Sequence, residues 1–548
     1  MRHDHDGKRM TWCFFAALAL LGSARAGEPA SNQTSDTKAL LCDYVRRFNA
    51  TDNEDVTNAI PNAAAESFLL ANVPRFACPD ADIERTYYFR WWTYRKHLRR
   101  KTGYWAVSEF LPNVHWAGRD NTIVCPAGHH FMEGRWLRDP QYMTELARFW
   151  LFYPGEADPC GHNCHSYANW ILTGIARFAE VAGLERELSG ELLPNAVTYY
   201  WAWVVQSQRW AWPQPGCQPM GGDGEGGFLS IDNFEGTECS LGRNGWKPMM
   251  NSAMVSEARV IAEAAELAGD PALAEIFRRK AERTREVLNA RCWNGRLGFY
   301  VTCETNGVQR LVRELHGYAP WYFGVADANH RPDWSQLADT NGFAAACGLT
   351  FPERRGEGFS LSYEGHACKW NGPSWPFATS VALTAMANDL HSPSAPREPA
   401  ERDRLTRLYA SLVRQYAVQQ QLTRPKGAGV ETVPWIDESA HPDRPEWFTR
   451  AILQSDGSKV ERGKDYNHST FCDLVISGLV GFVPKGKAGF VVEPLIPPDW
   501  DWFVLEDLRY RGHDIAIRWQ RGASGLTVWV DGRVAAQSEG LRAEVQWK

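Results

Sequence analysis

The chain has 548 residues, of which 44% are hydrophobic and 23% are charged, and its formal net charge is -6. This composition is typical of a large soluble globular protein and excludes a disordered chain. The acidic balance leaves no basic surface of the kind that binds nucleic acid. Many of the 25 tryptophans stand beside Arg, Asp or Glu. Flat aromatic faces next to hydrogen-bonding groups favour carbohydrate as the ligand class.

The first residues have the pattern of a secretory signal peptide. Lys8 and Arg9 precede the apolar run TWCFFAALALLGS, and the small residues ARA follow it before Gly27. We therefore expect cleavage after Ala26 and an exported, periplasmic or secreted protein. No later apolar stretch approaches the roughly 20 residues that span a bilayer. An oxidising compartment permits disulfides among the remaining cysteines, and the sequence leaves their pairing open.

From about residue 36 to 480 the dominant pattern is helical. It is clearest in 251–288, where apolar residues recur at three- and four-residue steps, Gly269 ends one helix and Asp270-Pro271 begins the next. Similar stretches lie at 38–49, 141–153, 165–184, 194–208, 374–390, 401–421 and 468–481. Short turns on one side and long loops on the other predict a helical solenoid or a closed toroid of helix pairs. Because no fixed sequence period is present, we favour the toroid.

The C-terminal residues change character. From about 485 to 548, apolar and polar residues alternate at period two and are interrupted by Gly, Asp and Pro. This pattern predicts a small antiparallel β unit packed on the helices. The predicted organisation is a signal peptide (1–26), a helical catalytic domain (27–484) and a C-terminal β-sandwich-like domain (485–548).

Two loops between predicted helices are rich in acids, aromatic residues and Gly or Pro. They are GGDGEGGFLSIDNFEGTECSLGRNGWKP (221–248) and WIDESAHPDRPEW (435–447). Hydrolysis of a glycosidic bond usually requires two carboxyl groups that face one pocket. One carboxyl is protonated and assists the leaving oxygen, and the other is ionised and activates water or attacks the sugar. These two loops are the predicted sources of that pair.

The order of several motifs resembles that of bacterial relatives of mannosylglycerate hydrolase. The motifs are YYFRWWTYRKHL (87–98), HHFMEGRWLRDP (129–140), EGTECS before PMMNSAM, WNGPSWPF (370–377), ESAHPDRPEW and DYNHSTFCDLVISGLVG (465–481). The family groups with the trehalases and processing α-glucosidases, which are inverting glycosidases of families 63 and 37. The resemblance implies a mainly α fold, an (α/α)6 toroid of the six-hairpin glycosidase type.

The resemblance also implies two catalytic residues. Glu238 takes the place of the general acid, which is an Asp in the family, so Glu235 and Asp232 remain alternatives. Glu438, before HPDRPEW, takes the place of the base. Partial burial and a nearby negative charge would keep Glu238 protonated near neutral pH. Inversion requires the two carboxyl groups to stand roughly 6.5 to 9.5 Å apart.

Other residues in these motifs are candidates for binding the sugar. Trp and Arg in RWW could stack on a ring and bind hydroxyls, although a buried cation–π contact explains them equally well. Gly and Pro fix a tight loop around KWNGPSWPF. The predicted substrate-binding residues are Arg90, Trp91, Trp92, Glu133, Arg135, Trp136, Arg243, Trp246, Trp370, Asn371, Trp375, His441, Tyr466 and His468.

Metal and cofactor motifs are weaker. CGHNCH brings Cys160, Cys164 and His165 together, but it lacks a second paired cluster for zinc, so a disulfide or buried thiols are favoured. GGDGEGG lacks the spacing of a calcium loop. No phosphate cradle or GxSxG elbow is present. We expect neither a metal nor an organic cofactor.

The sequence therefore predicts an exported, exo-acting glycoside hydrolase that inverts the anomeric carbon of an oligo- or polysaccharide substrate. A sugar epimerase or polysaccharide lyase on the same toroid would instead use His129, His130, Tyr466 or His468 for proton transfer. A non-catalytic glycan-binding protein would keep the aromatic pocket without needing the acids. The sugar, its linkage and the oligomeric state are left open.

Overall fold

The computed structural model describes residues 36–100, 103–151, 167–205, 221–393, 397–455, 457, 461–522 and 525–547. The predicted signal peptide and the CGHNCH motif lie outside these residues. The described residues from Thr37 onward form one compact unit. None of the described helices combines the length and apolarity that a membrane crossing requires.

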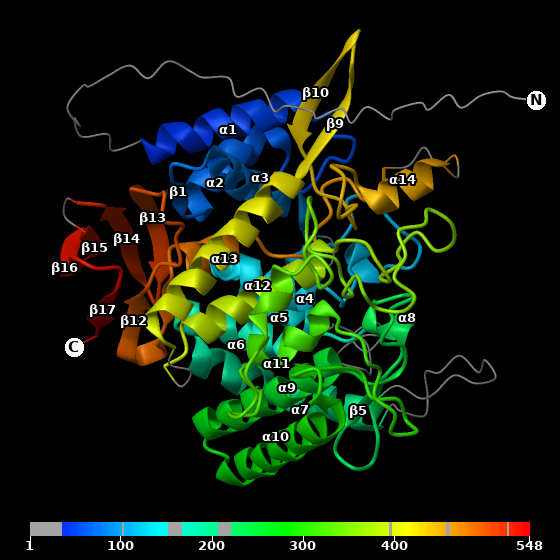
Figure 1. The fold of residues 1–548 in the computed structure, drawn as a ribbon. Helices are drawn as coiled ribbons and strands as arrows, with labels where there is room; N and C mark the ends of the chain where they lie inside the picture. Colours follow the sequence, from blue (N-terminus) through cyan, green and yellow to red (C-terminus); the bar gives the residue numbers. More distant parts are fainter. Residues whose placement is uncertain are drawn as a thin grey trace, which may run out of the picture. The chain divides into compact units, whose positions relative to one another are not determined.

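The described chain is mainly helical, as predicted (Figure 1). Its α-helices are α1 (Thr37–Thr51), α2 (Ala65–Asn72), α3 (Ala81–His97), α4 (Ala127–Gly134), α5 (Gln141–Leu151), α6 (Ile171–Ala182), α7 (Glu185–Val205), α8 (Asp232–Glu235), α9 (Pro248–Ala268), α10 (Pro271–Cys292), α11 (Ala319–Tyr322), α12 (Pro376–Leu390), α13 (Pro399–Gln419) and α14 (Phe448–Ser455). The helix expected at 468–481 is mostly a short π-helix, Leu474–Leu479.

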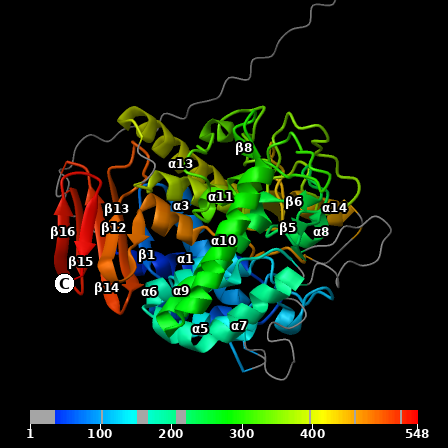
Figure 2. The same ribbon diagram turned by 90° about the horizontal axis from the view of Figure 1, so that it is seen from below.

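Helices α9 and α10 form the predicted hairpin, and both views show them side by side (Figures 1 and 2). Helix α9 ends at Gly269, whose φ of 82° is left-handed and therefore suits glycine. The Asp270 side chain then accepts the N–H of Leu273 at 2.9 Å, and Pro271 occupies the first helical turn. The connection between α9 and α10 is short because the C-cap Gly269 and the N-cap Asp270 are consecutive residues.

The other helices pack in a chain of neighbours. Helix α3 contacts α1 and α13, α13 contacts α12, α12 contacts α11, and α11 contacts α9, which also meets α6 and α7. Their buried faces contribute to one hydrophobic core that extends into the C-terminal strands. The closed six-pair toroid stays a prediction.

The C-terminal strands belong to two antiparallel sheets (Figure 1). The first has the order β1 (Arg75–Ala77), β13 (Trp502–Tyr510), β14 (His513–Gln520), β15 (Gly525–Val530) and β16 (Arg533–Ser538). The second has the order β11 (Phe482–Pro484), β12 (Gly489–Val492) and β17 (Ala543–Gln546). Strand β1 lies early in the chain and was not predicted; its Phe76 is paired with Leu505. The division at residue 484 stays a prediction.

A hairpin of β9 (Gln421–Lys426) and β10 (Gly429–Pro434) leads directly into the acidic loop 435–447 (Figure 1). The sequence analysis assigned no strand there. Shorter strands are β2 (Leu98–Arg99), β3 (Ala106–Val107), β4 (Gly221–Gly222), β5 (Phe228–Ser230), β6 (Gly245–Trp246), β7 (Trp293–Asn294) and β8 (Phe299–Tyr300). Strands β4, β5 and β6 form a small sheet within the other acidic segment, 221–248.

Candidate active site

Glu438 lies in the loop between β10 and α14. The loop is pinned to the start of α12 by two backbone hydrogen bonds between Ser374 and Ala440, at 2.9 and 2.8 Å. The Phe448 N–H also donates to the Ser439 carbonyl at 2.7 Å. These bonds turn Glu438 inward, so that it is only 1% exposed. An acid in a Pro-rich loop is thus buried because the loop's backbone is fixed at both ends.

Glu238 follows the short helix α8. That helix ends at Gly236, whose φ is 71°, and a Cβ there would stand 2.9 Å from the Cys125 sulfur. The Glu238 carbonyl accepts the N–H of Trp370 at 2.8 Å. The segment that carries the acid is therefore attached to the loop that carries the predicted aromatic residues.

Both acids line one cavity of about 330 Å³. Of the predicted binding residues, Trp370, Trp375, Tyr466 and His468 also line it. The remaining lining residues were not predicted as site residues: Glu109, Phe110, Trp116, Ile123, Cys125, Tyr167, Gly236, His366, Cys368, Phe377 and Arg462. Two loops that are 200 residues apart in the sequence therefore meet at one cavity.

Glu109 is a third carboxyl group in the cavity. It follows β3, is 6% exposed, and accepts a hydrogen bond from the Tyr466 hydroxyl. Glu109 was not predicted as a site residue because it stands in SEFLP, outside the two Gly- or Pro-rich acidic segments from which the catalytic acids were chosen. The neighbouring residue Phe110 packs on the Tyr466 ring, with centroids 4.7 Å apart.

Burial gives two of these carboxyl groups unusual acidities. Burial, with smaller contributions from Glu438 and Asp232, raises the pKa of Glu238 from 4.5 to about 7. Burial also raises the pKa of Glu109 to about 8, and the charges of Glu438 and Glu238 act in the same direction. Both groups are therefore largely protonated at slightly acidic pH, and Glu238 can give up a proton near neutrality.

Glu438 has a different environment, because a cation lies against it. Nη2 of Arg462 lies 2.9 Å from Oε1 and 3.0 Å from Oε2, and its hydrogen bond goes to Oε2. The Cys368 thiol donates to the same Oε2 at 3.0 Å. The ion pair favours the charged form of this carboxyl group. The cavity thus contains one carboxyl group with a raised pKa and one that is paired with an arginine, a difference in environment of the kind that separates a general acid from a general base.

Aromatic rings supply flat walls. Trp370 and Trp375 are stacked with centroids 4.0 Å apart and an interplanar angle of 5°. Trp116 is 40% exposed, and the Arg462 guanidinium carbon lies 5.2 Å from its ring centroid. Rings of this kind can cover the apolar face of a sugar while the carboxyl groups bind its hydroxyls.

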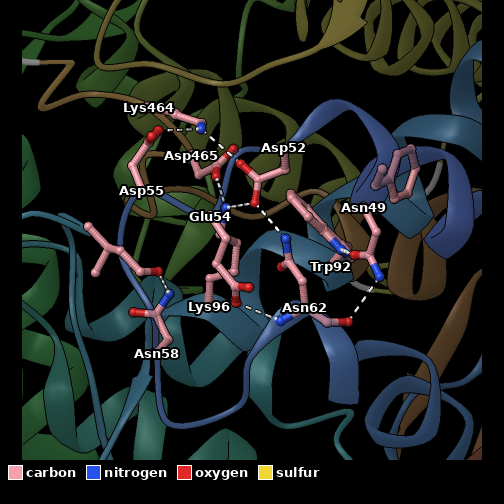
Figure 3. Close-up of polar contacts among 12 residues, drawn as sticks. Asn49, Asp52, Glu54, Asp55, Asn58, Asn62, Trp92, Lys96, Lys464 and Asp465 are labelled. Carbon is pink, nitrogen blue, oxygen red and sulfur yellow. Dashed lines mark hydrogen bonds and ion pairs between the residues drawn. The ribbon is translucent and has the colours of Figure 1, made fainter.

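A buried ion-pair network holds the segment that carries Tyr466 and His468 (Figure 3). Nζ of Lys96 lies 2.9 Å from Asp52 and 2.6 Å from Asp465, and Lys464 lies 2.8 Å from the same Asp52. Asp465 has a φ of 59°, a left-handed conformation that a non-glycine residue keeps only where its surroundings fix it.

We expect Lys96→Met to destabilise the fold by roughly 3–5 kcal/mol, because it leaves two buried carboxylates without their shared cation. Lys96, Asp52 and Asp465 side chains are between 2% and 4% exposed, so solvent cannot replace the lost charge. Chemical denaturation measures the change. Lys426→Met, which removes an ion pair from the exposed β9–β10 hairpin, is the control and should cost under about 1 kcal/mol. Equal effects of the two variants would contradict the prediction.

The raised pKa of Glu109 predicts a pH-dependent stability. Between its ordinary pKa of 4.5 and its folded value of about 8, the unfolded chain ionises while the folded protein stays protonated, so stability falls as pH rises through this window. Glu109→Gln removes this proton linkage. We expect the variant's Tm, relative to wild type, to be higher at about pH 8 than at about pH 5. Thermal melts at both pH values test this, with the exposed Glu357→Gln as control; a constant difference would contradict it.

The two alternatives for the acid do not line the cavity. Asp232 and Glu235 both pair with Lys247, whose Nζ lies 2.9 Å from Oδ1 of Asp232 and 2.7 Å from Oε2 of Glu235. Glu235 instead borders a separate small space of about 10 Å³. Lys247 therefore ties these two acids together beside the cavity, while Glu238 reaches it.

Arg90, Trp91 and Trp92 do not line the cavity either. Trp91 and Trp92 belong to the hydrophobic core, and Trp92 donates its indole N–H to Asn49. Arg90 donates to the Ser469 carbonyl at 2.5 Å. All three residues are buried within α3, and the cations that lie over the Trp92 ring are Arg95 and Lys96.

The cavity is also not lined by Glu133, Arg135 or Trp136. Glu133 accepts the backbone N–H groups of residues 471–473 at 2.9 to 3.3 Å. Arg135 and Trp136 both donate to Oδ1 of Asp473, at 2.6 and 2.7 Å. These side chains fix the segment after His468 and do not reach the cavity.

The remaining predicted residues surround the site without lining the cavity. Arg243 is exposed, and Trp246 donates to Asp223 at 2.7 Å within the 221–248 segment. Asn371 uses its backbone carbonyl to accept the Ser360 N–H. His441 accepts the Asp443 N–H at 3.1 Å through Nδ1. Each of the last three has a local contact that shapes one of the site loops.

Two histidines of the alternative mechanism, His129 and His130, are buried and do not line the cavity. His130 contacts the Asn467 carbonyl at 2.7 Å through Nε2. His129 packs edge-on against Trp170 and Phe377. Of the four proton-transfer candidates, only Tyr466 and His468 reach the cavity, and the Tyr466 hydroxyl is engaged with Glu109.

A larger cavity of about 470 Å³ lies between helices α6 and α12, the π-helix and β11. Its four lining carboxylates, Glu180, Asp327, Asp389 and Asp473, are each paired with an arginine. Judged by volume alone, this cavity would be the candidate active site. We favour the smaller one as the active site because it combines carboxyl groups of different protonation with aromatic walls.

The comparisons with known proteins point to the same chemistry. Residues 225–469 match the mannosylglycerate hydrolase MGH1-like glycoside hydrolase domain, a range that includes both Glu238 and Glu438. A solved structure named "Sialidase" is 29% identical, with a TM-score of 0.80, and the match covers 93% of this chain and 44% of that one. The resemblance to glycoside hydrolases noted from the motifs is thereby confirmed.

More distant structures also match. The GH78 family rhamnosidase of Bacillus sp. GL1 is 14% identical, with a TM-score of 0.50, over 83% of this chain and 41% of that one. The GH63 mannosylglycerate hydrolase from Thermus thermophilus in complex with glucose is 12% identical, with a TM-score of 0.47, over 70% and 97%. The chain spans less than half the length of the sialidase and rhamnosidase chains.

Proposed function

We propose that this chain, a glycoside hydrolase with an MGH1-like domain, removes a terminal sugar from an oligo- or polysaccharide with inversion of the anomeric carbon. The observation that carries the proposal is the meeting of Glu238 and Glu438 in one aromatic-walled cavity. Glu238 is the general acid and Glu438 the general base. We further propose that the helix pairs close into an (α/α)6 toroid and that residues 1–26 direct export.

The two carboxyl groups divide the reaction between them. Glu238 gives its proton to the glycosidic oxygen as the bond from that oxygen to the anomeric carbon breaks. Glu438 takes a proton from a water molecule whose oxygen bonds to the anomeric carbon from the opposite face. Glu238 ends ionised and Glu438 protonated, and exchange with solvent restores both. The raised pKa of Glu238 and the Arg462 ion pair of Glu438 support these starting states.

Glu238 is supported over its neighbours as the acid. Asp232 and Glu235 are held by Lys247 and do not line the cavity, so neither carboxyl group faces a sugar bound there. Glu109 is also protonated, and its contact with Tyr466 suits it to binding a sugar hydroxyl. A hydrolase that uses the carboxyl pair is better supported than a lyase or epimerase. The Tyr466 hydroxyl is engaged with Glu109, Nε2 of His468 contacts the Glu438 carbonyl at 3.0 Å, and His129 and His130 do not line the cavity.

The cavity favours a neutral terminal sugar. At about 330 Å³ it is near the lower limit of ligand pockets, which suits an end unit better than the interior of a polymer. Among the described lining residues, Arg462 is the one arginine or lysine, and it is paired with Glu438. An acidic sugar would therefore meet carboxyl groups without a free cation opposite its charge.

Proton NMR of the reaction tests the mechanism. A screen of neutral and acidic aryl glycosides first identifies a substrate, and we expect turnover on neutral ones. The first anomer released should have the configuration opposite to that of the substrate, before mutarotation mixes the two. Release of the retained anomer would contradict single-step inversion and would require a carboxyl separation nearer about 5 Å.

A further inference from the structure

The two oxygens of the Glu438 carboxylate have different surroundings. Oε2 accepts hydrogen bonds from the Cys368 thiol at 3.0 Å and from Arg462 at 3.0 Å. Oε1 is buried and lies 2.9 Å from the same Nη2 of Arg462, but no described residue directs a hydrogen bond to it. Arg462 also donates to the Cys368 sulfur at 3.1 Å, so that Cys368, Arg462 and Oε2 contact one another pairwise.

The segment that carries Cys368 is fixed to both acid-bearing loops. The Thr449 hydroxyl, at the start of α14, donates to the Ala367 carbonyl at 3.1 Å. On the other side, the Trp370 N–H donates to the Glu238 carbonyl at 2.8 Å. Residues 367–370 therefore connect the loop of the base to the loop of the acid, and the thiol stands between these two anchors.

The thiol can act only as a donor to Glu438 in this place. Burial and the neighbouring Glu438 raise the pKa of Cys368 well above its ordinary value, so the S–H proton is retained. A neutral thiol next to an ionised carboxylate donates its proton in a hydrogen bond, while its sulfur receives one from Arg462. The thiol thus acts on Oε2 alone, whereas Arg462 contacts both oxygens, and no described residue directs a hydrogen bond to Oε1.

We propose that Cys368 is a positioning residue for the base: its thiol holds Oε2 of Glu438, whose charge is paired with Arg462, so that Oε1 receives the proton of the attacking water. The proposal rests on the proposed function of Glu438. It assigns a role to a cysteine that the sequence motifs did not indicate, and it explains why one carboxylate oxygen of a buried acid has no hydrogen-bond donor among the described residues.

Kinetics of Cys368→Ala and Cys368→Ser test the proposal. In the alanine variant we expect kcat to fall about tenfold with KM within about twofold, because the base is misplaced while sugar contacts remain. The acid side of the pH–rate profile should move up by about 0.5 to 1 pH unit, because a donor to the ionised base is lost. The serine hydroxyl can donate in the same place, so Cys368→Ser should recover kcat to within about threefold.

Controls separate the possible failures. Cys42→Ala removes a thiol from α1, remote from the cavity, and should leave the profile unchanged. If Cys368→Ala does not melt cooperatively, Cys368→Val replaces it, since valine fills the thiol's volume without a donor. An unmoved acid side, or equal losses in the alanine and serine variants, would overturn the proposal. Full activity of Glu438→Gln would instead overturn the function on which it rests.

Discussion

Glu438→Gln is expected to lower kcat by about 10³-fold, within the roughly 10²- to 10⁴-fold contribution of general base catalysis. The amide keeps the size of the side chain but cannot accept the proton of the attacking water. KM should change little, because the aromatic walls and Glu109 remain in place. Steady-state kinetics on the best aryl glycoside, with near- and far-UV circular dichroism to verify folding, measures the effect.

A matched control for this substitution lies in the same loop. Glu446→Gln changes the same functional group further along the chain, where the carboxylate contacts the Tyr363 hydroxyl and does not line the cavity. It should retain activity within about threefold. Wild-type turnover by Glu438→Gln would remove this residue from the mechanism, and equal losses in both variants would indicate an effect on the loop alone.

Glu238→Gln is expected to lower kcat by roughly 10²- to 10⁴-fold on glycosides with poor leaving groups, because the amide cannot protonate the departing oxygen. A dinitrophenyl glycoside leaves without that proton, so its turnover should fall by less than about tenfold. The measurement is the loss of kcat, variant against wild type, compared between the two substrates. A uniform loss on both would show that Glu238 is not the acid.

The pH profile gives a second test of the same residue. The acid works only while protonated, so wild-type activity should fall as pH rises through the Glu238 pKa of about 7. This alkaline decline should disappear in Glu238→Gln with the dinitrophenyl substrate. Glu109→Gln, which keeps Glu238, should retain both the decline and the wild-type dependence on leaving group. Loss of the alkaline decline in Glu109→Gln, with its retention in Glu238→Gln, would assign the acid role to Glu109 instead.

Several features of the fold were predictable from local sequence. The α9–α10 hairpin was predicted with its boundary, because Gly269, Asp270 and Pro271 each have a strong local preference that does not depend on the rest of the chain. The strands after residue 485 were predicted from alternation at period two. Strand β1 was missed, because three residues carry no usable period and the strand forms only by pairing with β13.

The acid-rich loops were also visible in the sequence, because clusters of Gly, Pro, Trp and carboxylates are unusual for plain turns. Within these loops the family resemblance indicated Glu238 and Glu438, and both line the cavity. The other motifs of the resemblance indicated Trp91 and Arg135 as well, but these two residues do not line the cavity. Composition marks a segment as part of a site, but the face on which each side chain lies depends on helix packing.

The sequence by itself determined the helical class, the glycosidase resemblance and the two loops that carry acids, since each depends on local pattern or motif order. Only the tertiary structure decided which acids share a cavity and that Glu109 is one of them. It also showed that Asp232 and Glu235 pair with Lys247 and do not line the cavity. The physical reason is that protonation state and access arise from burial and from groups that folding brings together, such as Arg462 against Glu438 and, across 357 residues, Tyr466 against Glu109.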